Sequence, residues 1–184
     1  MDLVWPAAEY LPSYVDALKQ RWSPDTQRAA AGPEELARIT ADAAAFLAGQ
    51  VDREGRGAPV LLPDGSTMPR LPGYKRWLWD GEFCGVIGLR WQPGTAELPP
   101  TCLGHIGYSV VPWRRRRGYA TRALGLLLPE AGSVGLPYVE LATDATNVAS
   151  RRVIEANGGV LLERCRKPAS HGGTPSLRYR IALT

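Results

Sequence analysis

A run of arginines followed by small residues is the part of the sequence best suited to bind a charged ligand. Residues 114–117 are all arginine, Gly118 follows, and Ala120 stands two positions later. Small residues let a ligand approach the backbone closely. A helical apolar pattern begins at Thr121, and the first N–H groups of a helix lack intrahelical acceptors and carry positive partial charge. The pattern therefore predicts an anion site of the kind that holds a phosphate.

Hydrophobic patterning places the elements around this turn. Residues 103–111 are rich in apolar side chains and end before Pro112, which lacks an N–H and cannot extend a central strand. Leucines at helical spacing follow in 119–128. A second strand is expected at 138–143, and a second helix at 147–157. The anion site would thus lie between a strand and a helix N-terminus.

Two polar residues open the second helix. Asn147 follows the second strand, and Ser150 lies one helical turn further on. The Asn147 amide can contact a ligand bound between the strands, or it can cap the helix, and the sequence leaves both open. Ser150 would face the same ligand, because residues three apart share a helix face.

The spacing Arg115-x-x-Gly118-x-Ala120 resembles the Arg/Gln-x-x-Gly-x-Gly/Ala signature of the GNAT superfamily of N-acetyltransferases. A Val-Val-Pro sequence at 110–112 precedes it, as the end of the family's fourth strand would. The segment 147–159 carries the family's Asn-x-x-Ala/Ser pattern and a later Asn-Gly pair. The sequence is therefore similar to GNAT proteins before and after the turn as well as within it.

This resemblance covers residues 74–184 and is nearest to a branch of uncharacterised bacterial acetyltransferases with a His-Ile-Gly-Tyr-Ser strand. It implies a mixed α/β GNAT fold, in which a mostly antiparallel sheet of six to seven strands is flanked by about four helices. The parallel fourth and fifth strands would splay apart to admit a cofactor. The expected organisation is one domain over 1–184, with N-terminal helices in 1–50, a Pro/Gly-rich loop in 51–73 and the cofactor-binding core in 74–184.

Local patterns supply the remaining elements. Helices are expected at 10–21 and 33–50, both from apolar residues at helical spacing. A hairpin of strands is closed by Asp80-Gly81, a strong turn signal. The hairpin strands are expected at 74–79 and 83–91, and two closing strands near 160–166 and 176–183.

Acetyl-CoA is the cosubstrate that the resemblance implies. In the family the turn holds the pyrophosphate through backbone N–H groups, and the preceding strand pairs with pantetheine. Either valine of 110–111 would also supply an N–H that polarises the thioester carbonyl, and Arg115 would add charge or pin the turn. Carried over residue by residue, the cofactor-binding set is Val110, Val111, Arg115, Arg116, Arg117, Gly118, Tyr119, Ala120, Thr121, Asn147 and Ser150.

An amine must lose a proton to form an amide, so a basic side chain is sought near the first strand. His105 is the first candidate, because an unperturbed imidazole has a pKa near 6.5. Its alternative is a buried histidine bonded to backbone. Glu82 in the hairpin turn and Asp144 after the second strand are further candidates. Where many family members have a tyrosine that protonates the leaving thiolate, this sequence has Ile154.

The implied reaction transfers an acetyl group from acetyl-CoA to a primary amine of a small molecule, such as an amino acid, an antibiotic or a polyamine. The amine would attack directly in a ternary complex. Because Ile154 cannot donate a proton, a non-catalytic acyl-CoA-binding or sensory module is the alternative from another class. The sequence sets neither the acceptor nor the length of the acyl chain.

Composition narrows the setting of this 184-residue chain. Its net charge of +4 concentrates in 114–117, and no groove-entering motif is present, so we expect no nucleic-acid partner. An RNA-binding domain would rest on the arginine run alone. Three scattered cysteines and two histidines predict no metal site and a reducing, cytoplasmic location. No apolar run approaches the ~18 residues of a membrane span. A homodimer is expected by analogy with the fold.

Overall fold

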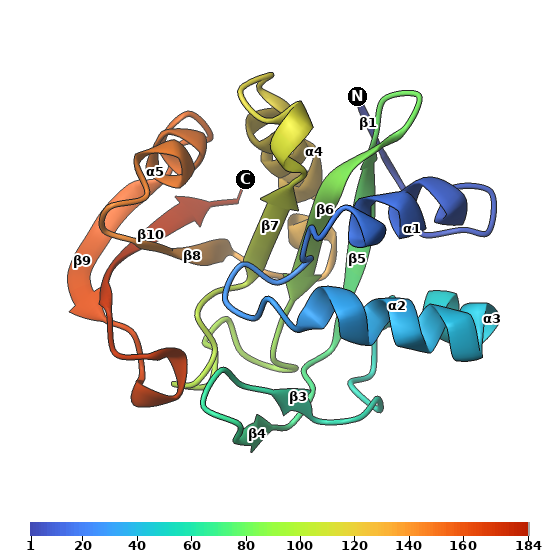
Figure 1. Ribbon diagram of the computed structural model, residues 1–184. Coiled ribbons are helices and arrows are strands. Elements are labelled where there is room, and N and C mark those ends of the chain that lie inside the picture. The colour runs from blue at the N-terminus through green and yellow to red at the C-terminus, as the bar shows by residue number, and fades with distance from the viewer. Residues whose placement is uncertain (184) are drawn as a thin grey trace.

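The structure is a computed structural model that describes residues 1–183, and it has the predicted mixed α/β architecture (Figure 1). Thr184, the last residue of the segment 74–184 predicted to bind the cofactor, lies outside the described residues. Most predicted elements form within two residues of their expected bounds. The strands are β1 (Asp2–Val4), β2 (Val51–Asp52), β3 (Val60–Leu61), β4 (Thr67–Met68), β5 (Gly73–Trp79), β6 (Phe83–Arg90), β7 (Ile106–Val110), β8 (Tyr138–Asp144), β9 (Val160–Arg166) and β10 (Pro175–Ala182). The helices are α1 (Leu11–Lys19), α2 (Ala31–Ala41), α3 (Ala43–Ala48), α4 (Tyr119–Ser133) and α5 (Val148–Glu155), with short 3₁₀ turns η1 (Pro112–Arg114) and η2 (Ala169–His171).

The expected central sheet is divided in two. One sheet has the order β1-β5-β6-β7, with β2 also paired to β5, and the other has the order β8-β10-β9. All strand pairs within them are antiparallel. Among the described residues, the only backbone hydrogen bond joining the start of β7 to β8 runs from His105 N–H to the Glu140 carbonyl, 2.8 Å away. The two strands therefore splay apart, as the resemblance implied.

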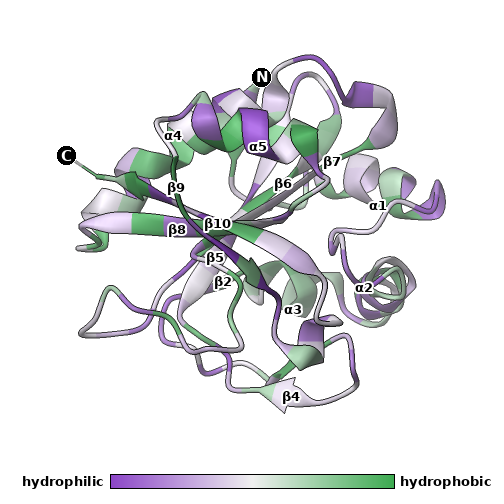
Figure 2. Cartoon of the chain, turned by 90° about the vertical axis from the view of Figure 1, so that its left-hand side faces the viewer, coloured by the Kyte–Doolittle hydropathy of each residue, from purple (hydrophilic) through white to green (hydrophobic). Residues whose placement is uncertain are grey.

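Helices lie on two sides of the strands, and they cover both faces of the β1-β5-β6-β7 sheet. Figure 2 shows α4 and α5 on one side of the strands, and α2 and α3 on the other. Leu124 and Leu127 of α4 are fully buried against Leu141 of β8 in one apolar core. On the other face, Tyr14 of α1 stacks on Trp77 of β5, with ring centroids 4.5 Å apart. Both faces of the β1-β5-β6-β7 sheet are thus covered, whereas the face of the β8-β10-β9 sheet turned away from α4 and α5 carries residues that line an open cleft.

Two segments differ from expectation. The helix expected over 33–50 is broken at Asp42, whose backbone is extended and whose Oδ1 accepts a hydrogen bond from Ala45 N–H at 2.9 Å. Asp42 thereby caps a separate helix, α3, as aspartate does in this position. The segment 51–73, expected as a loop, contains β2 and the β3–β4 hairpin. Leu62, which directly follows β3 in that hairpin, is buried, with 5% of its surface exposed.

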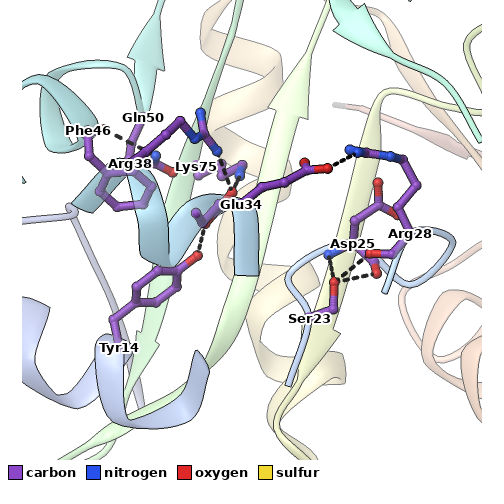
Figure 3. A network of polar contacts seen from close by, with 10 residues as sticks. Tyr14, Ser23, Asp25, Arg28, Glu34, Arg38, Phe46, Gln50 and Lys75 are labelled. Carbon is purple, nitrogen blue, oxygen red and sulfur yellow. Dashed lines mark hydrogen bonds and ion pairs between the residues drawn. The ribbon is translucent and has the colours of Figure 1, made fainter. Parts of the chain in front are cut away.

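Polar contacts hold the connection between α1 and α2 (Figure 3). The Ser23 hydroxyl lies 2.8 Å from the Arg28 carbonyl, and Arg28 forms an ion pair with Glu34 at 2.6 Å. The Tyr14 hydroxyl donates to Glu35, a carboxylate that is only 4% exposed. Burial, followed by the nearby Glu35 charge, raises the pKa of Tyr14 well above its ordinary value. This side of the molecule is therefore fixed by a buried network rather than by apolar contacts alone.

Within residues 1–183, no helix is both long enough and apolar enough to span a bilayer.

Candidate functional site

The basic turn has an unusual backbone that points N–H groups outward. Arg116 and Gly118 both adopt left-handed conformations, with φ of 62° and 74°. Gly118 is the N-cap of α4, and a Cβ built on it would meet no atom within 4 Å. In the described chain, the backbone N–H groups of 116–121 donate to no protein acceptor. They form a continuous set of free donors at the positive end of a fifteen-residue helix.

Three side-chain contacts fix the shape of this turn. Arg114 donates to Glu82 Oε1 from Nε at 2.7 Å and from Nη2 at 2.6 Å. The Tyr119 hydroxyl donates to Asp80, in the same β5–β6 turn. Arg115 Nε donates to the Val110 carbonyl at 3.1 Å, so this arginine pins the turn to β7. Arg116 and Arg117, which are exposed, remain available to a ligand.

The backbone of β7 has a free edge beside the turn. Val111 N–H donates to the Cys84 carbonyl of β6 at 3.0 Å. Because successive residues of an antiparallel strand point their N–H groups to opposite sides, Val110 N–H faces away from β6, toward the gap beside β8. Of the two valines predicted to contact the cofactor, Val110 offers a backbone donor to the gap.

Residues of α5 and α4 border the other side of the gap. Asn147 Oδ1 accepts from Ser150 N–H at 3.0 Å, so its amide caps α5 and its Nδ2 keeps two donors. Ser150 Oγ lies 2.9 Å from the Tyr108 hydroxyl of β7. Asn157 Nδ2 donates to the Thr121 carbonyl at 3.1 Å and ties α5 to the first turn of α4.

Tyr108 is a site residue that the sequence analysis missed. Its hydroxyl crosses from β7 to α5, and burial raises the pKa of its phenol. The available signal was its position two residues before Val110, which places both on the same side of the strand. Ile154, at the position of the family tyrosine, is 1% exposed and belongs to the core.

His105 lies at the closed end of the gap. Its side chain is 1% exposed, and Nδ1 accepts a hydrogen bond from Glu140 N–H at 2.9 Å. Nε2 has no hydrogen-bond partner among the described residues. Burial lowers the pKa of His105, against the opposing influence of the Glu140 charge. With Nδ1 as acceptor, the neutral ring carries its proton on Nε2, so its lone pair is already used.

The two predicted carboxylates lie apart from His105. Glu82 is engaged by Arg114 beside the basic turn. Asp144 ends β8, and its Oδ1 forms an ion pair with Lys167 at 2.6 Å, while Oδ2 has no contact in the described chain. The structure thus places the three proposed proton acceptors at three different points around the gap.

A cleft of about 460 Å³ opens on the outer face of the β8-β10-β9 sheet. The loop before β7 and the β9–β10 loop form its rims. His171 joins these rims, with Nε2 2.8 Å from the Thr101 carbonyl and Nδ1 3.1 Å from Gln27 Oε1 in the α1–α2 connection. The charged residues that line the cleft are Glu97, Glu140, Arg166, Lys167, Arg178 and Arg180.

In the described residues, no group of three or more histidine, cysteine, aspartate or glutamate side chains is arranged to hold a metal ion.

Comparison with known proteins identifies a family. A sequence model described as the acetyltransferase (GNAT) domain matches residues 12–160. No curated protein sequence matches the chain.

Solved structures share the fold over nearly the whole chain. One is the microcin C7 self-immunity acetyltransferase MccE in complex with acetyl-CoA and AMP, with a TM-score of 0.60, 13% identity, and coverage of 98% of this chain and 91% of that one. Another is the Salmonella typhimurium acetyltransferase that modifies the N-terminal serine of ribosomal protein L7/L12, with a TM-score of 0.60, 13% identity, and coverage of 99% and 94%. An acetyltransferase from Agrobacterium tumefaciens matches with a TM-score of 0.52, 19% identity, and coverage of 97% and 88%.

Proposed function

The chain belongs to the GNAT acetyltransferase family, and on that premise we propose that it transfers an acetyl group from acetyl-CoA to a primary amine of a small molecule. The amine attacks directly in a ternary complex, without a covalent enzyme intermediate. The observation that carries the proposal is the set of free N–H donors at 116–121, next to the exposed Arg116 and Arg117.

These residues fit a ligand with a diphosphate and an amide-containing arm. The donors of 116–121 and the left-handed Gly118 leave room for phosphate oxygens against the backbone. Val110 N–H faces the gap, and Asn147, which caps α5 through Oδ1, keeps its Nδ2 donors; in this proposal the two groups hold the arm, and Val110 N–H polarises a carbonyl. Acetyl-CoA supplies an acetyl group activated as a thioester when it is bound.

Among the three predicted proton acceptors, Asp144 is best placed for the base. His105 would have to give up its bond from Glu140 N–H, and Glu82 lies at the basic turn with Arg114. Asp144 keeps one carboxylate oxygen free at the end of β8, and Lys167 connects it to the cleft. A carboxylate in this position can take the proton that the amine loses.

The leaving thiolate needs no tyrosine at the position of Ile154. A thiol has a pKa near 8.5, so its thiolate is a stable leaving group near neutral pH. Tyr108 of β7, whose pKa is raised by burial, keeps a protonated hydroxyl that can donate a hydrogen bond.

A small-molecule acceptor is supported by the size of the cleft. Its volume of about 460 Å³ lies within the range of roughly 300–1,000 Å³ found for small-ligand sites. Two structures of the same fold differ in the kind of molecule that is named with them, since MccE was solved with AMP and the Salmonella enzyme modifies a protein N-terminus. A protein amine is therefore the competing acceptor. A cytoplasmic bacterial location and a homodimer stay predictions.

The proposal is tested by isothermal titration with acetyl-CoA, followed by thiol release across a panel of small amines. Binding with turnover of any small amine supports it. Binding without turnover across small amines and N-terminal peptides would support the non-catalytic acyl-CoA-binding module, which the replacement at Ile154 favours. Absence of acetyl-CoA binding would overturn both.

A further inference from the structure

Two arginines of one strand project over the floor of the cleft. On β8, Tyr138, Glu140 and Ala142 face the cleft, because their neighbours in the strand are buried in the core. On β10, Arg178 pairs with Ala142, and Arg180 pairs with Glu140. Alternate residues of a strand share a face, so both guanidinium groups lie on the cleft side.

The structure holds these guanidinium groups in place before any ligand binds. Arg180 donates to Glu140 Oε1 from Nη2 at 2.6 Å and from Nε at 3.2 Å, and it lies 3.8 Å from the centroid of the Tyr138 ring. Arg178 Nη2 forms an ion pair with Glu163 at 2.9 Å. Their side chains remain 41% and 46% exposed. A guanidinium has five N–H donors, so each keeps donors for a second acceptor.

The cationic side chains of the cleft can contact an anion. Four of them line it, of which Arg180, Arg178 and Lys167 are ion-paired with Glu140, Glu163 and Asp144. Arg166 is exposed and has no ion-pair partner within the described chain. The cleft is open to water, which screens the charges of these side chains. They therefore act mainly on the part of a ligand that lies directly against the arginines.

The cleft also begins where β7 and β8 part. Gly104 and Glu140 line it, and the hydrogen bond from His105 N–H to the Glu140 carbonyl marks the closed end of the gap. Lys167, paired with Asp144, lines the cleft nearer the open end. A molecule in the cleft can therefore bring an amine to the gap while another part contacts Arg178 and Arg180.

We propose that the acceptor amine carries an anionic group, a carboxylate or a phosphate, which Arg178 and Arg180 bind. This inference rests on the proposed function and narrows its substrate class. It disfavours polyamines, which would bring further positive charge next to the guanidinium groups of Arg178 and Arg180. It favours amino acids and amine phosphates.

Matched amines test the proposal directly. β-Alanine is compared with propylamine, and phosphoethanolamine with ethanolamine, by acetyl transfer and by titration into the protein saturated with coenzyme A. A charge-assisted contact predicts kcat/KM about 10- to 100-fold higher for an acid-bearing amine than for its neutral partner. The two pairs distinguish a carboxylate from a phosphate. Equal kcat/KM and equal affinity within both pairs would overturn the proposal.

Variants assign the preference to the arginines. Arg180→Gln and Arg178→Gln should each lower kcat/KM for the acid-bearing amine about tenfold and leave the acid-free amine within about twofold. Arg180→Lys keeps the positive charge but loses the bidentate guanidinium, so Glu140 retains a cationic partner. Arg164→Gln, on the same sheet but outside the cleft lining, is the matched control. An unchanged preference in folded Arg178 and Arg180 variants would refute the assignment.

Failure of the proposed function can be told apart from failure of this inference. If no amine is acetylated although acetyl-CoA binds, the enzymatic proposal fails. The titrations then still decide whether the cleft prefers the acid-bearing member of each pair.

Discussion

His105 and Glu140 are joined by two hydrogen bonds at the point where β7 and β8 separate. His105 N–H donates to the Glu140 carbonyl at 2.8 Å, and Glu140 N–H donates to His105 Nδ1 at 2.9 Å. The imidazole therefore closes one end of the gap between the strands. Protonation of Nδ1 would remove the second bond and place a charge in a site that is 1% exposed.

A loss of stability in mild acid follows from this contact. Because burial lowers the pKa of His105 in the folded protein, the unfolded chain binds more protons as the pH falls through 6.5. The free energy of unfolding should then decrease below about pH 6.5, with a slope from this group of at most about 1.4 kcal/mol per pH unit. Urea unfolding between pH 5 and 8 measures it. His105→Asn, which keeps an acceptor without titrating, should flatten the slope, and an identical slope in that variant would contradict the assignment.

Local signals predicted the elements that build the basic turn. Gly118 and the arginines before it specify a tight turn, and Leu124 and Leu127 specify the buried face of α4. Asp80-Gly81 likewise gave the β5–β6 hairpin, because its turn chemistry involves adjacent residues. The separation of β7 from β8 was expected from the family resemblance alone, because no local sequence pattern indicates it.

The cleft could not be predicted in the same way. Arg180 meets Glu140 only through the register of β10 on β8, forty residues away in the chain. The contact of Tyr108 with Ser150 likewise depends on how α5 crosses the gap. The break at Asp42 is different, because an aspartate before three alanines is a local capping signal that could have been read.

Gly118 and Gly135 offer a matched pair of substitutions at the two ends of α4. Both have positive φ, 74° and 87°, and a Cβ at either position meets no atom within 4 Å. Replacement by glutamate should therefore cost similar backbone strain, about 1–2 kcal/mol of stability. Gly118→Glu should also abolish acetyl-CoA binding in a titration, because it puts a negative side chain at the phosphate position. Gly135→Glu should bind normally, and equal affinity in the two variants would exclude the turn as the binding site.

The hydrogen bond between Tyr108 and Ser150 should couple β7 to α5. Tyr108→Phe and Ser150→Ala each remove one partner of the 2.9 Å contact, so each should lower the free energy of unfolding by about 1 kcal/mol. The double variant should cost less than the sum, with a coupling energy of about 0.5–1 kcal/mol. Urea unfolding of the four proteins gives this cycle. Strict additivity would show that the two hydroxyls act independently.

Asp144 should be required for proton removal from the amine. Asp144→Asn should lower kcat/KM about 100- to 10,000-fold, the range for loss of a general base, while acetyl-CoA affinity stays unchanged. Residual activity should rise with pH, because a larger fraction of the acceptor is then already deprotonated. Lys167, whose side chain is 8% exposed, would lose its partner, so Asp144→Asn/Lys167→Gln is made as well to remove the unpaired charge. Glu34→Gln is the control, since Glu34 is similarly exposed and ion-paired but lies on α2. A rate near that of the unmodified protein in the folded double variant would rule out Asp144 as the base.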